Sequence, residues 1–175
     1  MVERLLAFCM LVPTAFFSAL SAFTAQNAGA GLKRRTRACL KISLLICFIV
    51  DLIIFFLIQA IPAYFVGLFT TDTSIAAHAV AYCRSYAGDI IAVVFVFCLN
   101  GFFSGYGRTK FSMVNNLVST FLIRIPMVYL VSLTPGVSLF YIGLAAPCAS
   151  AVQIAMQLVY YRVIPDWKDD RVVTT

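Results

Sequence analysis

The sequence predicts an all-α fold, a polytopic membrane bundle of five transmembrane helices, and three observations lead to this prediction. Of the 175 residues, 62% are hydrophobic and only 11% are charged, whereas soluble domains are about half apolar and roughly a quarter charged. Five apolar segments follow one another, and each meets the requirement of about 20 residues for crossing a bilayer. The Lys and Arg residues gather in alternate connections between these segments, as in other multi-pass membrane proteins.

The predicted helical bundle occupies residues 1–164. Its apolar segments are residues 5–24, 38–69, 75–104, 111–133 and 137–164. The second segment is about 48 Å long as a helix, so it must tilt, kink or extend beyond a hydrocarbon core of about 30 Å. Pro62 supplies a break near its far end, because proline lacks the N–H of a helix hydrogen bond. Residues 165–175 mix acidic and basic side chains and are predicted to form a short cytoplasmic tail.

The distribution of basic residues predicts the orientation of the chain. They lie after the first, third and fifth segments: Lys33, Arg34, Arg35, Arg37 and Lys41, then Arg108 and Lys110, then Arg162, Lys168 and Arg171. The other two connections, residues 70–74 and 134–136, contain neither Lys nor Arg. The positive-inside rule therefore places the N-terminus outside and the C-terminus in the cytoplasm. A cleaved signal peptide is disfavoured, because the strongest basic cluster follows the first apolar run instead of preceding it.

Charge placement and residue spacing argue against several other functions. The net charge is +6, but the bases lie at segment ends, which is typical of topology signals and not of a nucleic-acid-binding surface. The six cysteines are scattered and His78 is the only histidine, so no metal site, cofactor or disulfide framework is expected. No nucleophile with an acid–base pair is recognisable near the membrane interface, so the chain is not expected to be an enzyme.

Three ionisable residues lie deep inside the apolar segments: Asp51, Asp89 and Arg124. Charges at such depth are costly and usually face a protein interior or a water-filled cavity. Asp89 lies about 24 Å from the cytoplasmic turn, and Asp51 and Arg124 lie about 20 Å from the cytoplasmic ends of their segments. This similar depth predicts a shared ionic site. Two interpretations stay open, a structural ion pair that holds the bundle together and a carboxylate that exchanges a proton or a cation during transport.

Asp89 is the preferred coupling residue. Ser85 and Tyr86 provide hydroxyl groups near it, and Gly88 provides a weak point in the backbone. Asp51, by contrast, is flanked by apolar residues.

Polar and small residues elsewhere in the segments predict how the helices pack. Asn100 is followed by Gly101 and Gly105, a GxxxG motif that lets another helix backbone come close. Pro126, two residues after Arg124, predicts a kink. Four amide side chains are expected to form hydrogen bonds between helices: Asn115, Asn116, Gln153 and Gln157.

Five short stretches, taken together, resemble the multidrug and toxic compound extrusion (MATE) transporters. They are SAFTAQNAGAG (21–31), GLFTTD (67–72), NGFFSGYGRT (100–109), RIP (124–126) and YIGLAAP (141–147). The resemblance covers nearly the whole chain and corresponds to the last five of the family's twelve helices. It therefore implies most of one six-helix lobe, with the N-terminal lobe missing.

The resemblance also implies a function, namely antiport coupled to Na⁺ or H⁺ that exports drugs and other organic cations across the plasma membrane. On this basis the chain is a C-terminal fragment or a truncated member of the family. Some members carry an acid about one turn beyond Asp89, near Val93, so Asp89 is an approximate match. The alternative is a non-transporting membrane subunit or interaction module. The candidate residues are Asp89, Arg124, Asp51 and Asn100 for transport or coupling, and Gln26, Asn27, Gly101, Gly105 and Pro126 for cavity lining or packing.

Overall fold

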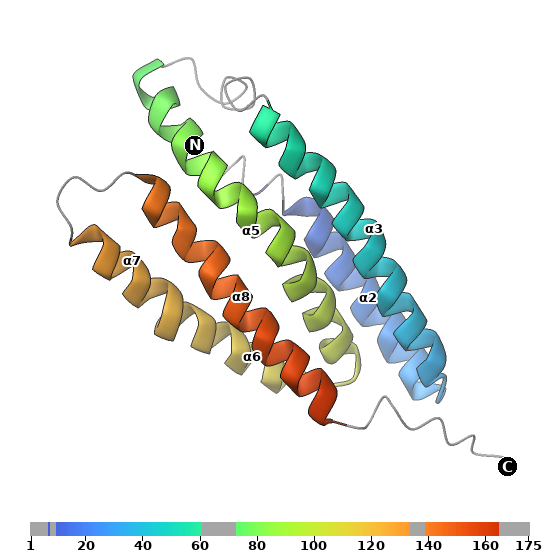
Figure 1. Cartoon of the computed structure of the whole chain (residues 1–175). Coiled ribbons are helices and arrows are strands. Elements are labelled where there is room, and N and C mark those ends of the chain that lie inside the picture. Colours follow the sequence, from blue (N-terminus) through green and yellow to red (C-terminus); the bar gives the residue numbers. More distant parts are fainter. Residues whose placement is uncertain (1–6, 8–9, 61–72, 134–138, 165–175) are drawn as a thin grey trace, which may run out of the picture.

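A computed structural model of the chain consists of long helices joined by short connections (Figure 1). It describes residues 7, 10–60, 73–133 and 139–164. In chain order the elements are α2 (Leu11–Gly29), α3 (Lys33–Ala60), α5 (Thr73–Gly105), α6 (Thr109–Val118), the π-helix η1 (Ser119–Arg124), α7 (Ile125–Ser132) and α8 (Leu139–Val163). Strands are absent from these described segments, and the predicted all-α fold is confirmed.

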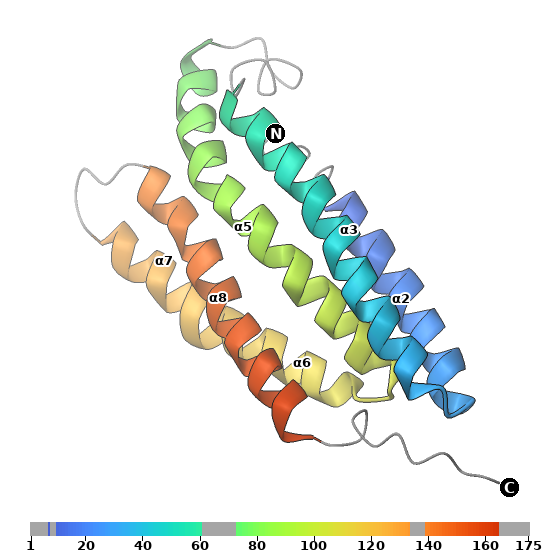
Figure 2. The same ribbon diagram turned by 45° about the vertical axis from the view of Figure 1, so that its right-hand side comes forward.

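Helix α5 is the centre of the bundle. Helices α2 and α3 pack against it and against each other, and α8 packs against it from another side (Figures 1 and 2). The continuous run of α6, η1 and α7 lies along α8, away from α3. Side chains of α5 are therefore enclosed by neighbours from both halves of the chain, which makes this helix the natural place for a buried site.

Four described segments are long and apolar enough to cross a bilayer: Lys33–Ala60, Ala87–Gly105, Thr109–Ser132 and Gly143–Val163. They correspond to the second, third, fourth and fifth predicted segments. Helix α2 corresponds to the first, and its last turns contain the polar residues Gln26 and Asn27. Large hydrophobic side chains such as Phe56, Phe121 and Val163 are exposed on the outside of the bundle. A surface of this kind is suited to lipid and not to water.

Two predicted helix boundaries are wrong. The first helix extends to Gly29 instead of ending at residue 24, and the second begins at Lys33 instead of residue 38. Apolar composition marks the part of a helix that contacts lipid. Helical hydrogen bonding of the backbone continues through the polar residues that follow or precede this apolar part, so the helices are longer than the apolar segments. Gly31, with φ of +73°, turns the chain between the two helices, because glycine adopts this left-handed conformation without steric cost. The predicted end of the second helix, at residue 69, and the Pro62 break lie outside the described residues.

The fourth predicted segment is interrupted by a π-helical turn. The sequence predicts one helix over residues 111–133, kinked at Pro126, whereas the structure divides this region into α6, η1 and α7. Pro126 lies in the first turn of α7, directly after the π-helix, where a proline cannot continue the hydrogen-bond pattern of the preceding turn. The Ser119 hydroxyl, at the start of η1, donates a hydrogen bond to the Ala149 carbonyl oxygen of α8 at 2.9 Å. The wider turn is thus attached to the neighbouring helix.

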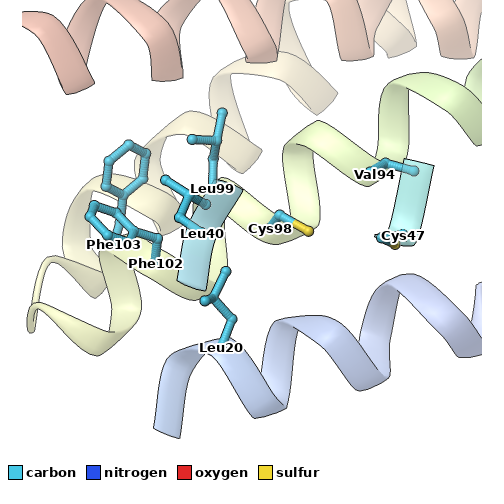
Figure 3. Close-up of a cluster of buried hydrophobic side chains, with 8 residues drawn as sticks. All are labelled: Leu20, Leu40, Cys47, Val94, Cys98, Leu99, Phe102 and Phe103. Atoms are coloured by element: carbon cyan, nitrogen blue, oxygen red, sulfur yellow. The ribbon is translucent and has the colours of Figure 1, made fainter. Parts of the chain in front are cut away.

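Buried apolar side chains join α2, α3 and α5 (Figure 3). This core cluster consists of Leu20, Leu40, Cys47, Val94, Cys98, Leu99, Phe102 and Phe103. Next to it, the rings of Phe111 on α6 and Tyr160 on α8 stack with centroids 3.5 Å apart. The Phe103 ring lies edge-on to both of them. The aromatic contacts therefore tie α5, α6 and α8 together at the end of the bundle where α5 turns into α6.

Helices α5 and α2 approach each other closely at two glycines. A Cβ atom at Gly101 would lie 2.8 Å from the Phe17 carbonyl oxygen, and one at Gly105 would lie 2.5 Å from Thr24 Cβ. Both distances are too short for a real side chain, so the helix spacing requires glycine at these positions. The GxxxG motif thus lies in the interface between α5 and α2, where a small residue lets two backbones come together.

Candidate functional site

A polar cavity of about 450 Å³ lies between α2, α5, η1 and α8, with α6 at its margin. Its apolar wall includes Phe17 of α2 and Val93 of α5. Its polar lining consists of Asp89, Asn100, Asn116, Thr120, Arg124, Ser150 and Gln153. The structure therefore brings together three of the four predicted transport residues, Asp89, Asn100 and Arg124, inside an otherwise apolar bundle.

Asp89 is buried in the wall of this cavity. Its side chain is 3% exposed, and its Oδ1 atom accepts a hydrogen bond of 2.5 Å from the Ser150 hydroxyl of α8. Hydrogen bonds to a carboxylate are shorter and stronger than those between neutral groups. The short bond orients the carboxylate while it lines a space that a small ion or a ligand could enter.

Helix α8 contributes a row of polar side chains that the sequence interpretation recognised only in part. Ser150, Gln153 and Gln157 are spaced i, i+3, i+7, so they share one face of the helix, and all three are buried. Gln157 Nε2 donates to Asn100 Oδ1 at 3.0 Å, and Gln153 Nε2 donates to Asn116 Oδ1. The predicted hydrogen bonds between helices are present. Ser150 was missed, although its spacing from the two glutamines was a usable signal.

Arg124 lines the same cavity from the π-helix, and its side chain is exposed. In the described part of the chain it forms no ion pair with Asp89, whose Oδ1 atom accepts the Ser150 hydroxyl hydrogen bond. The structure therefore places one acid and one base in the wall of one cavity without joining them.

Asp51 lies away from this cavity, which corrects the expectation of one site shared by three charges. It is fully buried on α3, and neither of its carboxylate oxygens has a hydrogen-bond partner. Equal depth along the membrane normal says nothing about the direction in which a side chain points. Helix α3 packs mainly on α2 and α5, whereas η1 packs on α6, α7 and α8, so Asp51 and Arg124 belong to different parts of the bundle.

The unpaired burial of Asp51 leads to a prediction about stability. A buried polar group without a partner costs about 1–3 kcal/mol, so Asp51→Leu is expected to raise the free energy of unfolding by roughly that amount. Thermal unfolding in detergent micelles should show a rise of about 2–4 °C for each kcal/mol. Asp89→Leu is the matched control and should lower the transition, because it removes the Ser150 hydrogen bond. A lower transition for Asp51→Leu would mean that the carboxylate has a stabilising partner.

The remaining candidates lie outside the cavity lining. Gln26 is exposed, whereas Asn27 is buried and its Nδ2 atom donates to the Phe23 carbonyl oxygen of its own helix at 2.8 Å. Pro126 is exposed on α7. Gly101 and Gly105 contact α2, as described above. The side chain of His78, which the sequence interpretation assigned to no site, is not among those that the structure describes.

Comparisons with known proteins bear on both the sequence and the fold. Residues 1–130 match the family model described as MatE, and no curated protein matches the chain. The fold is similar to a solved structure described as "Inward-facing conformation of a multidrug resistance MATE family transporter of the MOP superfamily", with a TM-score of 0.84 and 13% sequence identity. That match covers 99% of this chain and 40% of the other, so the chain spans about two fifths of that transporter's length.

Proposed function

Because this chain belongs to the MatE family of transporters, we propose that it forms part of an antiporter that exchanges Na⁺ or H⁺ for drugs or other organic cations. The family consists of transporters and not of enzymes. With four described segments long and apolar enough to cross a bilayer, the chain is a multi-pass membrane protein. The observation that carries the proposal is the polar cavity inside this bundle, with the buried Asp89 in its wall.

Asp89 is the group that we assign to coupling. A carboxylate in an apolar bundle is costly as a bare anion, so a proton, a metal cation or an organic cation on the cavity side of Asp89 would stabilise it further. One carboxylate neutralises one positive charge at a time. Binding of the coupling ion and binding of an organic cation therefore compete, and this competition makes their movements in opposite directions interdependent.

The neighbours of Asp89 contribute to the selectivity of this exchange. The Ser150 hydroxyl holds the carboxylate by a hydrogen bond of 2.5 Å. Arg124, which lines the same cavity, disfavours binding of a second cation. Asn100 and Gln153 add amide groups for hydrogen bonds to polar parts of a ligand.

We further propose that the chain corresponds to the C-terminal part of a twelve-helix transporter and that an N-terminal lobe completes the cavity. The solved transporter is longer, and this chain covers 40% of it. Basic residues after the first, third and fifth predicted segments support an outside N-terminus and a cytoplasmic C-terminus in the plasma membrane. Arg124 is exposed at the cavity, as expected for a wall that another lobe covers.

The proposal predicts that Asp89→Asn abolishes coupled transport while the protein stays in the membrane. The substitution keeps the size of the side chain but removes the charge that a cation or proton neutralises. Efflux of a fluorescent organic cation, driven by an imposed pH or Na⁺ gradient, should fall at least tenfold. The assay should use inverted vesicles, in which efflux from the cell is measured as uptake into the vesicle, with the longest reading frame that includes this chain.

Asp51→Asn is the matched control, because it makes the same chemical change outside the cavity and should leave transport unchanged. Undiminished efflux with Asp89→Asn would remove Asp89 from the mechanism. Absence of exchange with the unaltered protein under both gradients would favour the alternative of a non-transporting membrane subunit.

A further inference from the structure

A second hollow lies on the outer surface of the bundle, between α6 and α8, and it differs from the polar cavity in composition. It is an apolar groove of about 450 Å³. One wall is formed by α8 residues between Val152 and Val163, and Phe111 of α6 forms the other. Val159 and Val163 are 61% and 72% exposed, so the groove opens to the surroundings of the bundle.

The length of this groove matches one leaflet of a bilayer. From Val152 to Val163, helix α8 rises about 16 Å, and half of a hydrocarbon core of about 30 Å is about 15 Å. A single lipid chain lying along α8 would therefore extend from the membrane surface to near the middle of the bilayer.

Two basic residues are sequence neighbours of residues that line one end of this groove. Lys110 precedes Phe111, and Arg162 precedes Val163, and both basic side chains are exposed. The stacked rings of Phe111 and Tyr160, with centroids 3.5 Å apart, hold the beginning of α6 against the end of α8. The backbone positions of Lys110 and Arg162 are therefore brought to the same end of the groove, within reach of a headgroup there.

We propose that this groove binds an anionic phospholipid, with one acyl chain along α8 and the phosphate headgroup at Lys110 and Arg162. The apolar lining fits the chain, and the basic end complements the charge of the headgroup. Basic pockets between transmembrane helices bind anionic lipid headgroups by this combination of contacts. A zwitterionic phospholipid offers the same chain but no net charge. The site depends on the chain spanning a membrane and not on its transport activity.

Lipid titration followed by native mass spectrometry tests this proposal on the whole chain in detergent. The probes are phosphatidylglycerol and phosphatidylcholine with identical acyl chains. Phosphatidylglycerol is expected to bind more tightly. The double substitution Lys110→Gln with Arg162→Gln should lower its affinity about thirtyfold, because each base contributes about fivefold at a membrane surface, and phosphatidylcholine binding should not change.

Arg34→Gln with Lys41→Gln is the matched control for charge. Both residues are exposed on α3, which does not line the groove, and their removal lowers the net charge equally. This control should leave the preference for phosphatidylglycerol intact. Equal affinity of the two lipids, or an equal loss in the control, would overturn the assignment of the headgroup to Lys110 and Arg162.

A second pair of substitutions tests the groove itself. Ala155 lines it, whereas Ala151 is exposed on the same helix outside it. Ala155→Phe should weaken binding of both lipids, and Ala151→Phe should not. Unchanged binding with Ala155→Phe would refute the acyl-chain site. A dimer that Ala155→Phe dissociates would also refute it, because the groove would then be covered by a second copy of the chain.

Discussion

Replacing Gly105 by valine is expected to force α5 away from α2 and to destabilise the bundle by about 3 kcal/mol, at the upper end of typical overpacking costs. A Cβ atom at this position would lie 2.5 Å from Thr24 Cβ and 2.7 Å from the Ser21 carbonyl oxygen. The oxygen belongs to the backbone of α2 and cannot rotate away as a flexible side chain would. The helices themselves must therefore separate.

The effect of Gly105→Val is measured by thermal unfolding in detergent micelles. Gly29→Val is the matched control, because a Cβ atom at Gly29 would meet no atom within 4 Å and the substitution should cost far less. Gly101→Ala, with a Cβ position 2.8 Å from the Phe17 carbonyl oxygen, should give an intermediate loss. An unfolding curve for Gly105→Val equal to that of the control would show that α2 does not lie as close to α5 as described.

Separation of α2 from α5 would also displace one wall of the polar cavity. Phe17 of α2 forms part of the cavity wall, and its backbone carbonyl faces Gly101. The two glycines therefore determine how far this wall stands from Asp89. A variant that loses transport because of a displaced α2 should lose stability as well, which distinguishes it from Asp89→Asn, a change confined to one polar group in the wall.

The sequence predicted the membrane-spanning bundle well because lipid imposes simple requirements. A backbone in hydrocarbon must satisfy its own hydrogen bonds, so a long apolar segment is a helix. The segments predicted at residues 75–104 and 137–164 end within two residues of the described ends of α5 and α8, since polar flanks interrupt their apolar sequence. The two misplaced boundaries, at Gly29 and Lys33, lie in polar stretches through which the helix continues, so apolarity does not mark them.

Contacts between helices were harder to predict, because they depend on the direction of each side chain around its helix. Asp51 and Asp89 have similar depth, but only Asp89 lines the cavity. Ser150 carries no signal by itself, since serine is common in membrane helices. The π-helical turn before Pro126 widens the helix and contributes both Thr120 and Arg124 to the cavity. A proline predicts a break but not the kind of turn that forms it.

Replacing Phe102 by alanine is expected to cost about 3 kcal/mol, the lower end of the range for removing a buried aromatic ring. Phe102 is completely buried. The centroid of its ring lies 4.9 Å from the ring centroid of Tyr106 and 5.9 Å from the ring centroid of Tyr161. In a membrane the alternative environment is lipid and not water, so little transfer energy is lost. The cost comes mainly from the void and from the lost dispersion contacts of its lining.

Phe121→Ala is the matched control, because it distinguishes the loss of buried packing from the loss of an aromatic ring alone. The same atoms are removed at a position that is 59% exposed, where lipid chains fill the space, so the change in stability should be less than about 0.5 kcal/mol. Thermal unfolding of both variants in the same detergent gives the comparison.

Because the Tyr106 hydroxyl lies 2.7 Å from the Thr36 hydroxyl, loss of the Phe102 ring should also loosen the beginning of α3. Hydrogen exchange of the backbone amides at the beginning of α3 should increase with Phe102→Ala and not with Phe121→Ala. Equal effects of the two substitutions would contradict the packing role assigned to the Phe102 ring.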